Sequence, residues 1–191
     1  RTDVAKVRYN ENPYKIAYSG MLDYRQNVGL FVNAMPLIRN KSPTSEFYLS
    51  NKGDEKDKIK KLVNKQKIPA NFTWFESDVE YYNFIKTCDV GILTSSNDLP
   101  RQLGIPSKLF SYMAAGIPVV ANEIGGWTDI IKENKIGLVS NGDPYDFADK
   151  TIELLTNPKT IERMGRNAVE IIKNKFNWKK SAELYMDIYE H

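Results

Sequence analysis

The stretch that decides the fold is Gly104-Ile-Pro-Ser-Lys-Leu-Phe-Ser-Tyr-Met-Ala-Ala-Gly-Ile-Pro-Val-Val-Ala-Asn122. It predicts a loop, a short helix, a glycine stop and a buried strand. Ser107 is a favourable N-cap for the helix, and Gly116 ends it because glycine adopts the left-handed conformation at little cost. Pro118 suits the start of the strand that continues through residues 119–121.

The start of this helix is a candidate phosphate site. The free N–H groups of Lys108 and Leu109 point outward from the helix N-terminus, and such a terminus attracts anions. The side chain of Lys108 adds a full positive charge there. We therefore predict that Ser107 and Lys108 bind phosphate. The alternative is an ordinary N-cap followed by a surface lysine.

Strand and helix patterns alternate through the rest of the chain. Apolar runs predict strands at 15–19, 46–49, 71–75, 90–93 and 118–121, and helical periods fall at 27–39, 54–67 and 79–87. Alternation of this kind predicts an α/β fold, a Rossmann-like open parallel sheet of about six strands with helices on both faces. After Asp143 the alternation stops. Three helical stripes follow, at Phe147, Ala148, Ile152 and Leu155, then Ile161, Met164, Ala168 and Ile172, then Trp178, Ala182, Tyr185 and Tyr189.

The topology places the ligand of such a sheet outside the carboxyl ends of the strands, where the strand order reverses. The candidate loops follow Ser19, Phe75, Ser95 and Ala121. Gly20, at the end of the first strand, would let a phosphate or sugar approach the backbone closely.

Composition excludes several classes of function. The chain has 191 residues, 41% of them apolar and 27% charged, as in an ordinary globular domain. The net charge of +3 is too small to indicate a nucleic-acid partner. Cys88 is the single cysteine, so no internal disulfide forms, and its apolar surroundings predict a core thiol. The single histidine is the last residue, His191, which excludes an internal histidine base, triad or zinc pair.

Neither a signal peptide nor an apolar run long enough to span a membrane is found, so we expect a cytoplasmic location. One dense basic stretch, residues 54–67, mixes six lysines with three acidic residues. It is read either as a solvated helix face or as a weak contact with the anionic inner face of a membrane.

Residues 106–121 resemble the donor-binding segment of the family 4 group of retaining glycosyltransferases. Further matching pieces follow in order: Tyr18-Ser-Gly20, Asp89-Val-Gly-Ile-Leu-Thr-Ser95, Gly125-Gly126, Ile136-Gly-Leu-Val139, Gly142-Asp-Pro144 and Phe176-Asn-Trp178. The resemblance implies the glycosyltransferase-B fold, in which two Rossmann-like domains face each other and the C-terminal one holds the nucleotide-sugar. It runs from about Tyr14 to Tyr189 and corresponds to half of such an enzyme.

The resemblance also implies a division of the chain. Residues 1–14 would be a linker from a missing N-terminal domain, and the start at Arg1 agrees with an excised domain. Residues 15–175 would be the donor-binding domain. Residues 176–191 would form a helix that packs back on the N-terminal domain.

The site residues that the resemblance implies fall into three groups. Gly20, Arg25, Ser107 and Lys108 would bind the donor diphosphate; Arg101 and Ser111 would lie at the ribose or sugar; Glu76 and Ser77 would lie at the base. Catalytic residues are not assigned. No acidic cluster indicates a metal, and no cofactor is expected, because this fold stabilises the leaving diphosphate with cations and helix dipoles.

Four positions depart from the family pattern. The family usually has an arginine and a lysine where this chain has Met21 and Gln26, and a ribose-binding glutamate where it has Ser111. The first residue of the family's acidic pair falls near Leu103, which is not acidic. Arg25 could supply the missing charge from a shifted position or be simply exposed, and the same two readings apply to Arg101.

The resemblance implies hexosyl transfer, with retention, from a UDP- or GDP-sugar to a glycan or lipid-linked acceptor. An alternative is a non-catalytic interaction module that has lost the donor site, which the departures at Met21, Gln26 and Ser111 would explain. A nucleotide-sugar epimerase or another Rossmann-type cofactor domain is a third reading. The absence of a Gly-x-Gly-x-x-Gly turn after the first strand argues against NAD.

Overall fold

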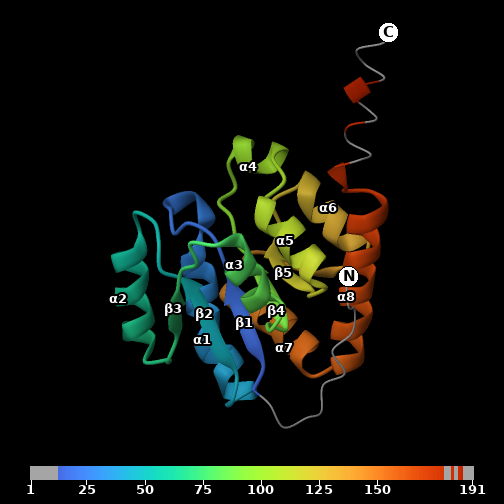
Figure 1. Ribbon diagram of the computed structural model, residues 1–191. Helices are drawn as coiled ribbons and strands as arrows, with labels where there is room; N and C mark the ends of the chain where they lie inside the picture. The colour runs from blue at the N-terminus through green and yellow to red at the C-terminus, as the bar shows by residue number, and fades with distance from the viewer. Residues whose placement is uncertain (1–12, 179–181, 183–184, 187–191) are drawn as a thin grey trace.

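The computed structural model describes residues 13–178, 182, 185 and 186 (Figure 1). Its centre is one six-stranded sheet with the order β3-β2-β1-β4-β5-β6, in which every neighbouring pair is parallel. The strands are β1 (Lys15–Tyr18), β2 (Glu46–Ser50), β3 (Asn71–Thr73), β4 (Val90–Leu93), β5 (Val119–Asn122) and β6 (Gly137–Ser140). The predicted α/β class and open parallel sheet are confirmed.

Helices connect the strands and follow the last one. They are α1 (Val28–Lys41), α2 (Lys56–Gln66), α3 (Asp78–Ile85), α4 (Leu99–Leu103), α5 (Ser107–Ala115), α6 (Gly126–Glu133), α7 (Pro144–Leu155) and α8 (Pro158–Asn174), with a 3-10 turn at Tyr24–Gln26. The helix α4 was not predicted, because it is short and its two leucines are exposed rather than buried. Asp98 begins it, and its carboxylate accepts a hydrogen bond from the backbone N–H of Arg101.

The helices cover both faces of the sheet (Figure 1). Strand residues alternate between two apolar cores, as the pleat requires. Ile16 and Tyr18 of β1 point to the core that α1, α2 and α7 cover, together with Phe31 and Phe147. Ala17 points to the opposite core, which α3, α5, α6 and α8 cover.

The helix α5 is fixed on the sheet by Tyr112, whose ring is fully buried. Its hydroxyl accepts a hydrogen bond from the backbone N–H of Ser19 at 3.0 Å and donates to the carbonyl of Ala17 at 3.1 Å. Gly91 of β4 lies directly under the ring, and a Cβ there would be only 2.6 Å from Cγ of Tyr112. The glycine therefore permits the close approach of α5 to the sheet.

The ends of α5 test the prediction made from its sequence. Gly116 ends the helix in the left-handed conformation, with φ of 71°, as predicted. The assignment of Ser107 as the N-cap is wrong, because Ser107 is the first helical residue and Pro106 precedes it in the cap position without a side-chain cap. The carbonyl of Pro106 accepts a hydrogen bond from the N–H of Leu109 at 2.9 Å, so the helix begins one residue earlier than predicted.

The ends of the chain lie largely outside the described residues. Of the predicted linker, only Pro13 and Tyr14 are described, and of the predicted last stripe Tyr189 is not. Trp178 and Tyr185 are exposed. The docking of this segment on another domain stays a prediction.

Cys88 is buried, as predicted. Within the described part of the chain, every helix is too short or too polar to cross a membrane.

Candidate functional site

A cavity of about 440 Å³ opens at the carboxyl edge of the sheet. It lies beside the point where the strand order reverses, because β1 leads to α1 on one face and its neighbour β4 leads to α5 on the other. The lining residues come from the end of β1 and the loop after it, the ends of β2 and β3, and the first two turns of α3 and α5. The loops after β4 and β5 do not line it.

Lys108 is the centre of the polar end of this cavity. Its ammonium donates hydrogen bonds to Oε1 of Gln26 at 2.8 Å and to the hydroxyl of Tyr18 at 2.9 Å, and it lies 4.1 Å from the centroid of the Tyr18 ring. Gly20 has a φ of +105°, and a Cβ there would lie 3.2 Å from Cε of Lys108. The glycine thus leaves room for the lysine side chain to reach across from α5 to the end of β1.

The surroundings of Lys108 favour its neutral form. Burial, the largest cause, and the positive charge of Arg101 together lower the pKa of Lys108 to about 7, although the nearby carboxylate of Asp23 acts in the opposite direction. An anion in the cavity would restore the ammonium, because a nearby negative charge favours the charged form of a lysine. The position of this side chain therefore suits an anionic ligand.

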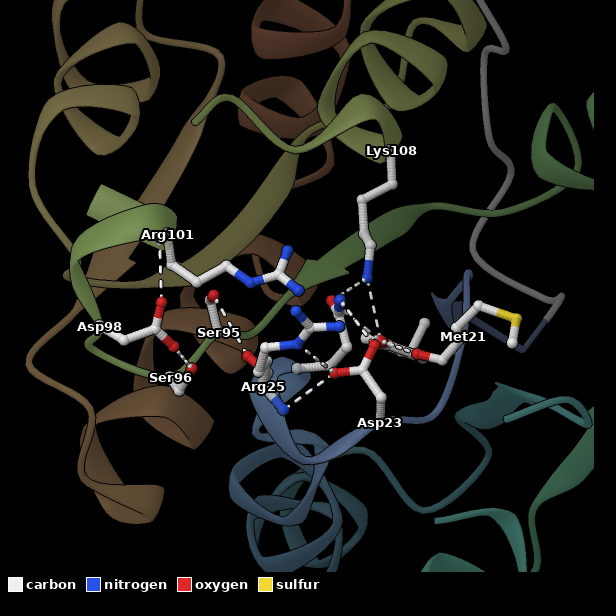
Figure 2. A network of polar contacts seen from close by, with 10 residues as sticks. Met21, Asp23, Arg25, Ser95, Ser96, Asp98, Arg101 and Lys108 are labelled. Carbon is white, nitrogen blue, oxygen red and sulfur yellow. Dashed lines mark hydrogen bonds and ion pairs between the residues drawn. The ribbon is translucent and has the colours of Figure 1, made fainter. Parts of the chain in front are cut away.

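Two arginines complete the cationic centre. Figure 2 shows the side chains of Arg25 and Arg101 extending toward the same space as Lys108, from the turn after β1 and from α4. Arg25 is paired loosely with Asp23, with Nε and Oδ1 at 3.6 Å. The three cations therefore lie around a single carboxylate, that of Asp23 (Figure 2). A bound anion would reduce the repulsion among the three positive charges.

Asp98, the carboxylate nearest to Arg101 in the sequence, serves α4 rather than the cavity. The hydroxyl of Ser96 donates a hydrogen bond to it, and the backbone N–H of Arg101 donates another (Figure 2). The bond from Ser96 is the main reason that the pKa of Asp98 lies below its ordinary value. This agrees with the role of a cap at the start of a short helix.

The structure brings together four of the residues predicted for the site. Gly20, Ser107, Lys108 and Ser111 all line the cavity. Arg25 and Arg101 lie beside Lys108 without lining it. Their binding roles stay predictions.

The two residues predicted at the base do not line the cavity. Ser77 is the N-cap of α3, and its hydroxyl accepts a hydrogen bond from the N–H of Val79. Glu76 precedes it and is exposed. The residues on either side, Phe75 and Asp78, do line the cavity. The segment predicted to contact the base therefore lines the cavity with Phe75 and Asp78 rather than with Glu76 and Ser77.

Several lining residues were missed from the sequence. Trp74 and Phe75 form an aromatic pair directly after β3, a signal that was available at the carboxyl end of a predicted strand. Tyr18 and Gln26 were not predictable in this role, because it depends on Lys108, some 80 to 90 positions away in the sequence. Gln26 occupies the position where the family pattern led us to expect a lysine, and here it accepts a hydrogen bond from Lys108.

Within the described residues, no group of three His, Cys, Asp or Glu side chains lies close enough together to hold a metal ion. The chemistry that the visible site offers is charge stabilisation by cations and by the N-terminus of α5.

Comparison with known proteins agrees with the architecture of the sheet and its helices. The family model described as "Glycosyl transferases group 1" matches residues 1–171. The uncharacterized glycosyltransferase MJ1178 of Methanocaldococcus jannaschii is 26% identical over 188 residues, which are 97% of this chain and 50% of that protein. Spore coat protein SA of Bacillus subtilis is 28% identical over 119 residues, 59% of this chain and 32% of that protein. The chain thus spans a third to a half of the length of these relatives.

Solved structures show the same fold. TarM of S. aureus, in a complex that includes UDP, is 21% identical with a TM-score of 0.80, and the match covers 98% of this chain and 38% of that one. Anabaena HepE, in complex with UDP and glucose, is 17% identical with a TM-score of 0.80, and the match covers 94% of this chain and 48% of that one. The C-terminal domain of the group 1 glycosyl transferase LpcC from Francisella tularensis matches over 87% of this chain and 89% of that one, at 19% identity and a TM-score of 0.73. The chain has the fold of the C-terminal half of a glycosyltransferase-B protein and belongs to the glycosyl transferases group 1 family.

Proposed function

We propose that this chain is the donor-binding part of a glycosyltransferase and that its cavity binds a nucleoside diphosphate sugar. The observation that carries the proposal is the position of Lys108, which reaches from the first turn of α5 to Gly20 at the end of β1. The diphosphate would lie between this ammonium and the free N–H groups of α5. Ser107, exposed in the same first turn, would contact it too.

The charge of the centre fits this ligand. Lys108, Arg25 and Arg101 carry three positive charges when Lys108 is protonated, and Asp23 removes one of them. The remaining double positive charge is equal and opposite to that of the two ionised phosphates of a nucleotide-sugar. The electrostatic match would favour both binding and the departure of the diphosphate.

The rest of the cavity fits a nucleoside. Trp74, Phe75 and Phe84 provide an aromatic end on which a base can stack, and a volume of about 440 Å³ lies in the ordinary range for small-molecule sites. The TarM and HepE structures contain UDP, which supports a UDP-sugar as the donor, with a GDP-sugar as the alternative.

Transfer would break the anomeric C–O bond while the diphosphate leaves against Lys108, Arg25 and the N-terminus of α5. The acceptor site and further catalytic groups would be supplied by the other half of the protein, since these relatives are about twice as long as this chain. The relatives include a poly(ribitol-phosphate) alpha-N-acetylglucosaminyltransferase and a glycogen synthase, which support a glycan or another polymer as the acceptor. Retention of configuration follows from the family resemblance.

The test is calorimetric titration of the chain with UDP, GDP and ADP and with their monophosphates, at fixed salt. We expect one diphosphate to bind more tightly than its monophosphate, and Lys108→Ala to weaken its binding at least about tenfold, the value of a charge-assisted contact. Lys65→Ala, which removes an exposed lysine of α2, should leave the affinity unchanged.

Two results would contradict the proposal. If Lys108→Ala binds the diphosphate as tightly as the parent chain, the phosphate does not lie at this lysine. If no diphosphate binds even at millimolar concentration, the non-catalytic module is favoured, and the replacements at Met21, Gln26 and Ser111 would explain the loss.

A further inference from the structure

We infer that Asp78, at the start of α3, binds the 2′,3′-diol of the ribose of the bound nucleotide. The inference rests on the proposed function, because it names the group that orients the nucleoside within the same cavity. Asp78 lines the cavity but was not among the residues predicted from the sequence.

The packing of α3 on α5 places Asp78 opposite Ser111. The hydroxyl of Tyr82 in α3 donates a hydrogen bond to the carbonyl of Ala114 in α5 at 2.9 Å. One turn before Tyr82 on the same helix face is Asp78, and nearly one turn before Ala114 is Ser111. Both helices begin at the carboxyl edge of the sheet and both side chains line the cavity, so we place them on the same stretch of it.

That stretch is the one a ribose must occupy. The phosphate end of the cavity is marked by Lys108 and Gly20, and the aromatic end by Trp74 and Phe75. The ribose of a nucleotide joins its phosphate to its base, so it must lie between these ends.

Apart from Ser107 and Lys108 at the phosphate end, the polar side chains of α3 and α5 that line the cavity are Ser111, Asp78 and Tyr81. The hydroxyl of Tyr81 is already hydrogen-bonded with that of Ser19 at 2.9 Å. Asp78 and Ser111 therefore remain as the groups from these helices that can meet the sugar.

The chemistry of Asp78 suits a pair of hydroxyl groups. Its carboxylate makes no hydrogen bond or ion pair with any residue that the structure describes, so both oxygens can accept from a ligand. Two adjacent O–H groups of a vicinal diol match the two oxygens of one carboxylate. Asp78 lies in the first turn of α3, where the positive end of the helix dipole interacts favourably with a carboxylate. Ser111 offers a single, weaker contact from the opposite side.

The experiment compares UDP with 2′-deoxy-UDP in the parent chain and in Asp78→Asn, by calorimetric titration at fixed pH and salt. In the parent, loss of the 2′-hydroxyl should weaken binding about tenfold, because one hydrogen bond to a charged group is removed. In Asp78→Asn the same change of ligand should cost about threefold or less, since the charged acceptor is gone. A merely structural role for Asp78 would weaken both ligands equally.

Glu80→Gln is the matched control. Glu80 is also an acidic residue in the first turn of α3, but it does not line the cavity. This variant should keep the full preference for UDP over the deoxy ligand. Asp78→Ser provides a second variant that removes the charge if Asp78→Asn is poorly folded.

Three outcomes would overturn the inference. In the first, the parent chain binds UDP and 2′-deoxy-UDP equally; in the second, the Asp78 variants keep the tenfold preference. In the third, the substitution weakens GDP and 2′-deoxy-GDP alike and leaves UDP unaffected, which would mean that the carboxylate reads the paired N–H groups of guanine instead. If the parent binds no nucleoside diphosphate at all, the proposed function itself fails, and this result is distinguishable from the other three.

Discussion

The two walls of the cavity are held in different ways. The α5 wall, residues 107–112, is anchored from below by a buried tyrosine, and the loop wall, residues 19–27, is anchored mainly by its backbone. In the α5 wall, Tyr112 fills the space above Gly91, and its hydroxyl joins Ser19 and Ala17. Because the whole turn is fixed, Lys108 leaves it in one direction, toward Gly20.

In the loop wall, Leu22 is fully buried, and its N–H donates to the carbonyl of Lys52 at 2.8 Å. On either side of this anchor the side chains extend outward: Met21 is 44% exposed and Tyr24 is 73% exposed. The side chain of Arg25 is also half exposed and only loosely paired. Because the α5 wall is fixed and the loop wall is exposed, Lys108 should contribute more to binding than Arg25, since ordering an exposed loop side chain costs entropy.

The largest effect should come from disturbing the base of the α5 wall. In Gly91→Ala the new Cβ would meet the Tyr112 ring at 2.6 Å, and the hydrogen bonds of the tyrosine hold that ring in place. We expect the free energy of unfolding to fall by about 3 kcal/mol, as for overpacked cores. Urea denaturation measures this change.

The control for this substitution is Gly29→Ala in α1, where the new Cβ would lie 3.7 Å from Cδ2 of Leu62, an ordinary contact. Its unfolding free energy should stay the same or rise by up to about 1 kcal/mol, because alanine favours a helix. Equal stability of the two variants would show that Tyr112 does not fix the wall.

A smaller effect should appear in the pH dependence of donor binding. The pKa of Lys108 is about 7 in the free protein, and a bound diphosphate raises it, because an opposite charge stabilises the ammonium. Affinity for UDP-glucose, whose phosphates do not titrate near neutrality, should therefore be highest below pH 7. It should fall about tenfold for each pH unit above 7 until the pKa of the complex is reached.

Titration calorimetry between pH 6 and pH 9 measures this dependence, and Lys108→Met supplies the control. The variant lacks the titrating amine, so its weak binding should not change with pH in that range. A flat profile in the parent chain would mean that Lys108 remains fully protonated before the ligand arrives.

The smallest effect should come from the loop wall. Arg25→Ala removes an exposed guanidinium that is not fixed by a strong ion pair, so UDP affinity should fall only about threefold. The loss should shrink further at high salt, since exposed charges are screened. If Arg25→Ala weakens UDP as much as Lys108→Ala does, the two walls do not differ in the way we describe.

The order of elements was predictable because it depends on local patterns. The apolar runs at 90–93 and 118–121 could only be strands covered on both faces, and the glycine at 116 could only end a helix. Prediction failed where local signals were weak or in conflict. The helix at Leu99–Leu103 is short and buries no residue, and the proline at 106 took the cap position expected for its neighbour.

The site was predictable in outline, because the carboxyl ends of parallel strands share one edge of the sheet. Gly20 and Lys108 were both predicted there from the family pattern. The base assignment missed the lining residues by a position or two, since which side chain of a connecting turn faces inward depends on how that turn joins its helix. The capping role of Ser77 is an example.

Local patterns were enough to predict the class of fold, the family and, to within one residue, the start of the helix that carries Lys108, because periodicity and helix-end residues act over a few positions of the chain. Only the tertiary structure decided that this lysine meets Tyr18 and Gln26, and that Asp78 borders the same cavity as Ser111. The residues in each of these pairs are 33 to 90 positions apart in the sequence. The strand order β3-β2-β1-β4 and the packing of α3 on α5 bring them together, and no local signal in the sequence encodes that arrangement.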